Sequence, residues 1–230
     1  LAQPLQAGTL QFFANGEDWA RAGFVAPQLT RDGWQLTFRH IFVTLAGITA
    51  YQTDPPYDAH HAGPIAAATR VVLPGSHTID LVADADADGR VLIGAVDAPA
   101  GHYNALSWMM TPADAGAVAG SSMVLIGHAT KGEQSIAFEL VSSEQSRYRC
   151  GEFVGDQRKG FVPAQGSADV EITFHLDHLF GRLDLPRDDP MNSSAPGFAP
   201  FAGTAGAQKV SLTGLHIGHV GEGHCGVSWQ

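Results

Sequence analysis

Two histidines and an aspartate lie within four residues in the segment from Thr173 to Gly181, TFHLDHLFG. Imidazole nitrogen binds zinc, copper(II), nickel and iron, and a neighbouring carboxylate can bind the ion or hold an imidazole in the correct tautomer. His175, Asp177 and His178 therefore suggest a transition-metal site. A local cluster of this kind supplies at most three ligands, so a complete site must recruit others from elsewhere in the fold.

The residues around this cluster alternate as in a β-strand with one buried face. The pattern predicts a strand from Ala168 to Leu176 and points His175 and Asp177 to the same side. If the chain turns after Asp177, His178 can swing back toward them. The apolar face consists of Val170, Ile172, Phe174 and Leu176, and the polar face of Glu171, Thr173, His175 and Asp177.

The chain contains 11 histidines in 230 residues, and several beyond this cluster are candidates to complete the site. Those in the C-terminal segment 214–226 lie among glycines, which permit the bends that bring imidazoles together. Two others lie at predicted strand positions. Taken singly, a histidine is more often a surface or hydrogen-bonded residue than a ligand, so the grouping carries the hypothesis. The candidate metal ligands are His175, Asp177, His178, His219, His224, His40 and His102.

Two other segments offer oxygen or nitrogen donors. Asp84, Asp86 and Asp88 in DADADG resemble the first half of an EF-hand calcium loop, but position 12 is Ala95 and a strand pattern follows. We therefore expect a solvated turn rather than a calcium site. In the loop 52–64, a weaker surface site could form from His60, His61, Asp54 and Asp58.

The two cysteines, Cys150 and Cys225, both lie beside glycine in polar segments. That setting favours a disulfide between a strand end and the C-terminal segment over two buried thiols. The bond would close a loop of about 76 residues, stabilise the fold by roughly 4 kcal/mol in the chain-entropy model, and hold the tail against the domain. It also predicts an oxidising compartment such as the periplasm; the alternative is a pair of free cytosolic cysteines.

Strand signals are frequent along the chain and helix signals are scarce. We predict a single antiparallel β-sandwich domain over residues 1–230, with little helix. The segment 182–209 lacks periodicity and is rich in Pro, Gly, Ser and Ala, which predicts a long loop that is either functional or poorly ordered. The predicted strands are Gly33–Tyr51, Thr69–Leu73, His77–Val82, Arg90–Val96, His102–Met110, Ser122–Thr130, Gln134–Val141 and Ala168–Leu176.

Charge and hydropathy exclude some classes of partner. The net charge is -10, and the 13 Lys and Arg residues form no basic cluster, which argues against a nucleic-acid or anionic-membrane surface. No apolar run approaches the roughly 18 residues that span a bilayer. The sequence begins at Leu1 without Met, so we expect that a signal peptide or lipid anchor has been removed.

Three segments, DGWQLTFRHIFVTLAGITAY, APAGHYNALSWMM and ITFHLDHLFG, resemble secreted bacterial β-sandwich proteins that include the MbnP-like copper-binding periplasmic family. In that group an AG-x-Y turn leads into a strand, and histidines gather at one end of the sandwich. The resemblance spans Gly33 to Gly181 and implies an extracytoplasmic metal-binding protein. It assigns no ligand of this chain residue by residue.

The leading hypothesis is a secreted or periplasmic protein that binds zinc or copper(II), with iron ranked below them. Its role would be metal capture, buffering or delivery to a membrane transporter or another periplasmic protein, without catalysis. One alternative is a carbohydrate- or protein-binding module without metal. Another is a metalloenzyme, which would need an open coordination position and a general base such as Asp177 or Glu222.

Overall fold

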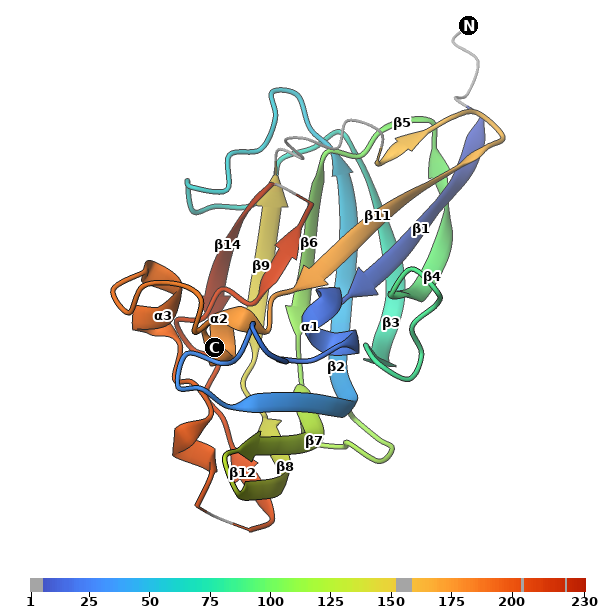
Figure 1. The fold of residues 1–230 in the computed structure, drawn as a ribbon. Helices are drawn as coiled ribbons and strands as arrows, with labels where there is room; N and C mark the ends of the chain where they lie inside the picture. The colour runs from blue at the N-terminus through green and yellow to red at the C-terminus, as the bar shows by residue number, and fades with distance from the viewer. Residues whose placement is uncertain (1–5, 152–158, 204, 222) are drawn as a thin grey trace, which may run out of the picture.

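The computed structural model describes residues 6–151, 159–203, 205–221 and 223–230. Within these ranges the protein is mostly β, with two main sheets packed together in a sandwich-like arrangement (Figure 1). The prediction of a β-sandwich with little helix is confirmed. The sheets are mixed rather than purely antiparallel, because each contains one parallel pair of strands.

The smaller sheet, sheet A, carries the predicted histidine strand. Its strands, in order across the sheet, are β13 (Gly218–Val220), β11 (Ser167–Phe174), β1 (Ala7–Asn15) and β4 (Arg90–Pro99). β1 and β11 are parallel to each other. Every second residue of β11 is buried, as the alternation predicts, and the buried positions continue beyond the strand to Leu176. Sheet A therefore presents an apolar face to the core and a more polar face to solvent.

The larger sheet, sheet B, is organised around the long strand β2 (Gln35–Gln52). The first half of β2 pairs with β7, and its second half pairs with β3 and β6. A separate two-stranded sheet consists of β5 (Gly101–His102) and β10 (Phe161–Val162). The other strands of sheet B are β12 (Ala207–Lys209), β8 (Gln134–Ser142), β7 (Met123–Lys131), β6 (Ala105–Met110), β9 (Ser146–Gly151), β14 (His224–Trp229) and β3 (Thr69–Asp80).

One strand, β3, replaces the two strands predicted at Thr69–Leu73 and His77–Val82. It continues through Pro74 and Gly75 because its register against β2 shifts at Gly47, where φ is 60°. Among the described strands β3 pairs only with β2, and an edge strand tolerates a proline because one of its sides needs no ladder hydrogen bond. A β-bulge in β2 thus keeps β3 continuous where the sequence predicts a break between two strands.

The described part of the segment 182–209 contains regular structure where the sequence predicts a long loop. It contains α3 (Pro190–Ser194), the 3₁₀ turn η1 (Ala199–Phe201) and β12. The carboxylate of Asp32 accepts hydrogen bonds from the backbone of Phe198 and Ala199, and the Phe198 ring is fully buried. Contacts with distant residues, rather than local periodicity, hold this segment in place.

Two short helices, α1 (Glu17–Arg21) and α2 (Asp177–Phe180), complete the fold. None of the helices in the described ranges is long and apolar enough to cross a membrane.

The disulfide between Cys150 and Cys225 is present, as predicted. The two residues face each other in the antiparallel pair of β9 and β14, so the bond joins neighbouring strands of sheet B. Cys150 is the next-to-last residue of β9, as the predicted strand-end position requires, but it is fully buried rather than in polar surroundings. Closing a loop with a sequence separation of 75 stabilises the fold by about 4 kcal/mol in the chain-entropy model. The bond is consistent with an oxidising compartment.

Candidate metal centre

Two parallel strands bring the site residues together because they end at the same edge of sheet A. Asn15, the last residue of β1, lies opposite Thr173 of β11. The chain enters α1 directly after β1 and α2 soon after β11 (Figure 1). Glu17 and His175 therefore lie side by side although they are 158 positions apart in the sequence.

Asn15 fixes this edge of the sheet through its side-chain amide. Its Nδ2 donates to Oε1 of Glu171 and to Oγ1 of Thr173, and its Oδ1 accepts from the backbone N of Glu17. Glu17 has a φ of 56°, in the left-handed region that costs a residue with a Cβ about 1–2 kcal/mol. This backbone conformation places Oε2 of Glu17 2.9 Å from Nδ1 of His175.

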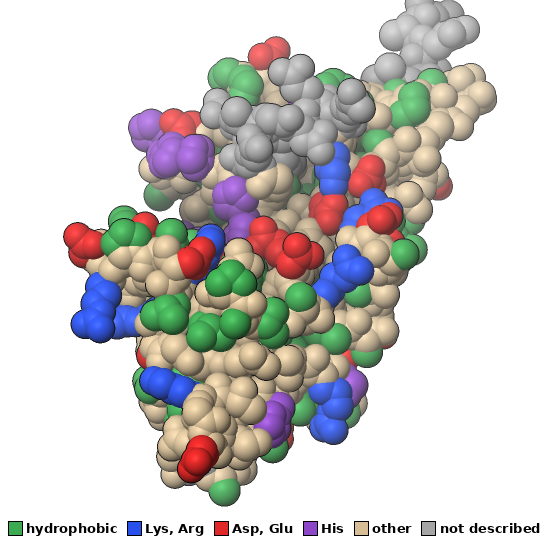
Figure 2. Space-filling model, in the orientation of Figure 1, with side chains coloured by type: hydrophobic (Ala, Val, Ile, Leu, Met, Phe, Trp, Pro, Cys, Tyr) green, Lys and Arg blue, Asp and Glu red, His purple; other side chains and the backbone are tan. Residues whose placement is uncertain are grey.

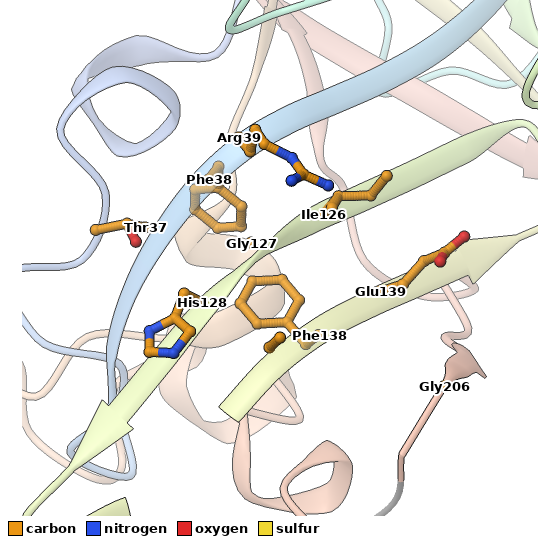
Figure 3. A pocket seen from close by; sticks show the side chains of 10 residues that line it. Thr37, Phe38, Arg39, Ile126, Gly127, His128, Phe138, Glu139 and Gly206 are labelled. Carbon is orange, nitrogen blue, oxygen red and sulfur yellow. The ribbon is translucent and has the colours of Figure 1, made fainter. Parts of the chain in front are cut away.

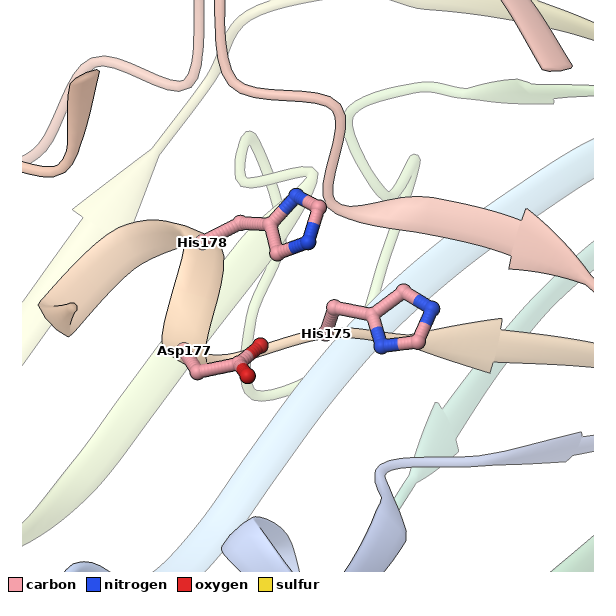
Figure 4. Close-up of side chains that lie close together, drawn as sticks. All are labelled: His175, Asp177 and His178. Atoms are coloured by element: carbon pink, nitrogen blue, oxygen red, sulfur yellow. The ribbon is translucent and has the colours of Figure 1, made fainter. Parts of the chain in front are cut away.

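His175, Asp177 and His178 form a compact group at the start of α2. Each offers one ligand atom, and these atoms all lie within 4.8 Å of one another. The three side chains point toward a common space between the end of β11 and α2 (Figure 4). The predicted grouping of these three residues agrees with the structure. The predicted strand to Leu176 is too long, because β11 ends at Phe174 and α2 begins at Asp177.

The carboxylate of Asp177 is the most unusual group of the cluster. The residue is only 6% exposed, and its Oδ1 is buried without a hydrogen-bond partner among the described residues. A buried charged oxygen without a donor costs several kcal/mol in free energy, and native structures seldom tolerate one without a functional reason. A cation bound beside the two imidazoles would satisfy this oxygen.

The C-terminal segment reaches the cluster through β13. This strand pairs with β11 so that His219 lies opposite Thr173, and the backbone N of His175 donates to the carbonyl of Ile217 at 2.7 Å. The rings of His175 and His219 meet edge to face with centroids 5.4 Å apart. His219 is therefore positioned beside the cluster.

Gly218 allows β13 to lie this close to the core. A Cβ at this position would lie 2.8 Å from Cε1 of Tyr148 and 3.0 Å from Cζ2 of Trp108, two stacked rings of sheet B. Burial raises the pKa of Tyr148 to about 12, so its hydroxyl stays neutral where it meets the backbone of Gly218. The glycine thus allows β13, an edge strand of sheet A, to pack closely against the aromatic rings of sheet B.

Two imidazoles of this region have one ring nitrogen hydrogen-bonded to a residue outside the His175, Asp177 and His178 group. Nδ1 of His175 is 2.9 Å from Oε2 of Glu17, and Nδ1 of His219 is 2.8 Å from the carbonyl O of Gly221. Such outer hydrogen bonds fix the tautomer and ring orientation of metal-binding histidines.

Without a bound cation, the pKa shifts of the group do not favour an ionised carboxylate beside neutral imidazoles. Burial raises the pKa of Asp177, although the neighbouring histidines oppose the shift. Burial lowers the pKa of His178 and of His219. Burial also acts to lower the pKa of His175, but the hydrogen bond and charge of Glu17 outweigh it and the pKa is raised. A divalent cation would favour the ionised carboxylates and neutral imidazoles together.

The donor set selects a class of ion. Imidazole and carboxylate donors suit zinc, copper(II) and iron(II) better than soft copper(I), which prefers sulfur ligands. The two cysteines of the chain are joined in the disulfide and supply no thiolate. The carboxylates of Asp177 and Glu17 also provide two negative charges, which match a divalent cation.

The other predicted ligands contact different groups. His224 packs against His60, with ring centroids 4.4 Å apart. His40 lies on β2, where its Nδ1 is 2.6 Å from Oδ2 of Asp80. His102 stacks on Phe161 at a centroid distance of 3.7 Å. Within the described chain, none of these three belongs to the compact group around Asp177.

The acidic segment 84–89 forms a turn, as expected. Oδ1 of Asp86 accepts hydrogen bonds from the backbone N of Asp88 and Arg90, and Oδ2 of Asp84 accepts from the backbone N of Asp80. These oxygens are used by the protein's own backbone, which agrees with a solvated turn rather than a calcium loop.

Two of the surface hollows in the described structure differ in their position: one lies beside the cluster and the other lies over sheet B. One, of about 520 Å³, is lined by His178 and His216 together with Met191 and Leu215. The other, of about 730 Å³, lies over β2, β7 and β8 and is lined by Phe38 and by other residues of these strands (Figure 3). Only the first adjoins a predicted metal ligand.

Glu17 is the site residue that the sequence reading misses. The segment before it, AGTLQFFAN, alternates buried and more exposed positions as clearly as β11 does, and this signal predicts a strand. Its parallel pairing with β11 is a tertiary feature that the alternation does not specify. Glu222, a candidate general base, lies outside the described residues.

No family model, curated protein or solved structure matches this chain. The resemblance to the MbnP-like family therefore stays a prediction, and function has to be inferred from the geometry and chemistry of the site.

Proposed function

We propose that this protein binds a divalent transition metal, zinc or copper(II), through His175, Asp177 and His178. His219 and Glu17 both contact His175, where they would support the coordination. The observation that carries the proposal is the buried Oδ1 of Asp177, which lacks a hydrogen-bond donor and lies in a group with two imidazoles.

The outer hydrogen bonds support the same proposal. They hold the histidine rings in place before an ion arrives, so binding requires little reorganisation. Such a preorganised site suits capture, buffering or delivery of the ion. The disulfide favours an extracytoplasmic setting such as the periplasm, where a membrane transporter or another periplasmic protein would receive the ion.

The test is metal analysis of protein purified without an affinity tag, followed by zinc titration of the purified apoprotein. We expect about one tightly bound ion per chain, and loss of that ion in the His175→Ala/His178→Ala variant. The matched control is His77→Ala/His128→Ala, which removes two histidines that contact Pro74 and Ser135 rather than the cluster. Zinc and copper(II) binding no tighter than about micromolar, or full retention of metal in the first variant, would contradict the proposal.

A metalloenzyme is the second candidate, and the hollow beside His178 favours it because a substrate could approach the ion there. A catalytic metal keeps a coordination position open, whereas a storage or delivery site can be filled by the protein. Adding azide to the copper(II)-loaded protein separates the two. A changed copper spectrum favours the enzyme, and an unchanged spectrum favours the binding protein.

A further inference from the structure

A second pair of histidines meets on the surface beside the C-terminal strand. The rings of His60 and His224 have centroids 4.4 Å apart and are tilted by 49°. His60 belongs to the loop between β2 and β3, and His224 is the first residue of β14. Both are exposed, and neither ring makes a hydrogen bond to another described residue. Their free ring nitrogens are therefore available to a ligand.

Two glycines hold the loop against the tail. A Cβ on Gly151 would lie 2.1 Å from the carbonyl O of Tyr57, and a Cβ on Gly226 would lie 3.0 Å from the carbonyl O of Ala59. Gly151 pairs directly with His224 in the β9 and β14 ladder. The loop backbone can thus lie against this strand pair, beside the disulfide, and this contact sets His60 against His224.

Asp58 orders the turn that carries His60. Its Oδ1 accepts a hydrogen bond from the backbone N of His60 at 2.9 Å, and its Oδ2 is 2.7 Å from Nδ1 of His61. The carboxylate adds a negative charge to the turn that carries His60 and His61. Nitrogen donors beside a carboxylate suit a divalent transition-metal ion.

We propose that His60 and His224 form a second, exposed metal-binding position for zinc or copper(II). The proposal rests on the transition-metal role proposed above, but its ligands are separate from those of the cluster around Asp177. Water would fill the remaining coordination positions. Two exposed imidazoles bind an ion more weakly than a buried site with three protein donors, so this position fills after the inner one.

The outer position lies along a band of histidines that leads to the inner site. His219 contacts the inner cluster, because its ring meets that of His175 edge to face with centroids 5.4 Å apart. The rings of His175 and His178 then lie 5.1 Å apart. Histidine side chains run from the upper left of the molecule toward the acidic group near α1 in Figure 2.

Zinc titration calorimetry on four proteins tests the second position: the unaltered protein, His60→Ala/His224→Ala, His175→Ala/His178→Ala and the control His77→Ala/His128→Ala. We expect the unaltered protein and the control to show a tight and a weaker event, about two ions per chain in total. The outer variant should lose only the weaker event. The inner variant should lose only the tight event. Circular dichroism checks that every variant is folded.

The outcomes separate this inference from the proposed function. If the weaker event is absent from the unaltered protein, or persists in the His60→Ala/His224→Ala variant, the outer position is wrong while the inner site stands. If the weaker event depends on His60 and His224 but no tight event occurs, the outer position stands and the proposed inner site is wrong. Loss of both events in the outer variant, with its fold intact, also contradicts a separate outer position.

Discussion

Among the described residues, two buried aspartates lie beside histidines, and one of the two has a carboxylate oxygen without a hydrogen-bond donor. Asp80 is 3% exposed, and its Oδ1 accepts from the backbone N of Ile41 and Val82 while its Oδ2 meets His40. Asp177 is 6% exposed, and its Oδ1 has no donor among the described residues. The carboxylate of Asp80 has its hydrogen-bond donors within the protein, whereas Oδ1 of Asp177 has none among the described residues.

The pKa shifts of the two carboxyl groups follow the same contrast. Burial acts to raise the pKa of Asp80, but the hydrogen bonds from His40 and the backbone outweigh it, so the pKa is lowered. Burial raises the pKa of Asp177, and the neighbouring histidines do not reverse it. A histidine beside a buried aspartate therefore does not by itself distinguish a candidate metal site, since Asp80 and Asp177 both have one; the lack of a donor to Oδ1 of Asp177 is what distinguishes them.

The same substitution at both positions should separate their effects on metal binding most strongly. Asp177→Asn removes a charged ligand and should weaken zinc binding by about 100-fold or more. Asp80→Asn should leave the zinc dissociation constant unchanged, since Asp80 contacts His40 and the backbone of β2 rather than the cluster. Zinc titrations of both variants measure this difference, and equal losses would erase the distinction between the two regions.

The Asp80→Asn and Asp177→Asn substitutions should change the free energy of unfolding of the metal-free protein in opposite directions. Asp80→Asn exchanges a charged acceptor for an amide and should lower the free energy of unfolding by about 2 kcal/mol. Asp177→Asn removes a buried charge without a donor and should raise it by about 1 kcal/mol. Urea unfolding in the presence of a chelator provides the comparison. Destabilisation of both variants by similar amounts would mean that Asp177 is a structural residue like Asp80.

Glu17 should act on the inner site alone. Glu17→Gln keeps the shape of the side chain but removes the charge beside Nδ1 of His175, and we expect zinc affinity to fall about tenfold. Glu144→Gln, which alters a carboxylate bound to Ser211 and Leu212, serves as a charge-matched control. Zinc titration of both variants gives the result; an equal loss in the control would point to net charge instead of local contact.

The contributions of the two aspartates to the free energy of unfolding should also change in opposite directions with pH, each by about 1 kcal/mol. The folded pKa of Asp80 lies below its ordinary value of 3.8, so its contribution is present above that value and is lost as pH falls through the folded pKa. The folded pKa of Asp177 lies above 3.8, so the metal-free protein loses stability as pH rises through that range. Unfolding curves of each Asp→Asn variant against the unaltered protein, from acid to neutral pH, measure both slopes. A slope at Asp177 of the same sign as at Asp80 would refute the contrast.

Alternation in sequence was sufficient to predict the sandwich. The grouping of His175, Asp177 and His178 is predicted from their closeness in sequence and a turn near Asp177, whereas the alternation extends the strand to Leu176, beyond its end at Phe174. The alternation indicates the buried face of β11 correctly because period-2 burial is a local property. It does not indicate the parallel pairing with β1, which brings Glu17 to the site, because strand order depends on tertiary contacts. Nor does it separate His219, which reaches the cluster, from His224, which meets His60.

The most direct test of the inner site is a crystal structure of the zinc-loaded protein, with anomalous diffraction recorded on both sides of the zinc absorption edge. We predict a strong anomalous peak within about 2.0–2.2 Å of a nitrogen of His175, a nitrogen of His178 and an oxygen of Asp177. A well-occupied zinc ion elsewhere, with Oδ1 of Asp177 still lacking a partner, would contradict the account.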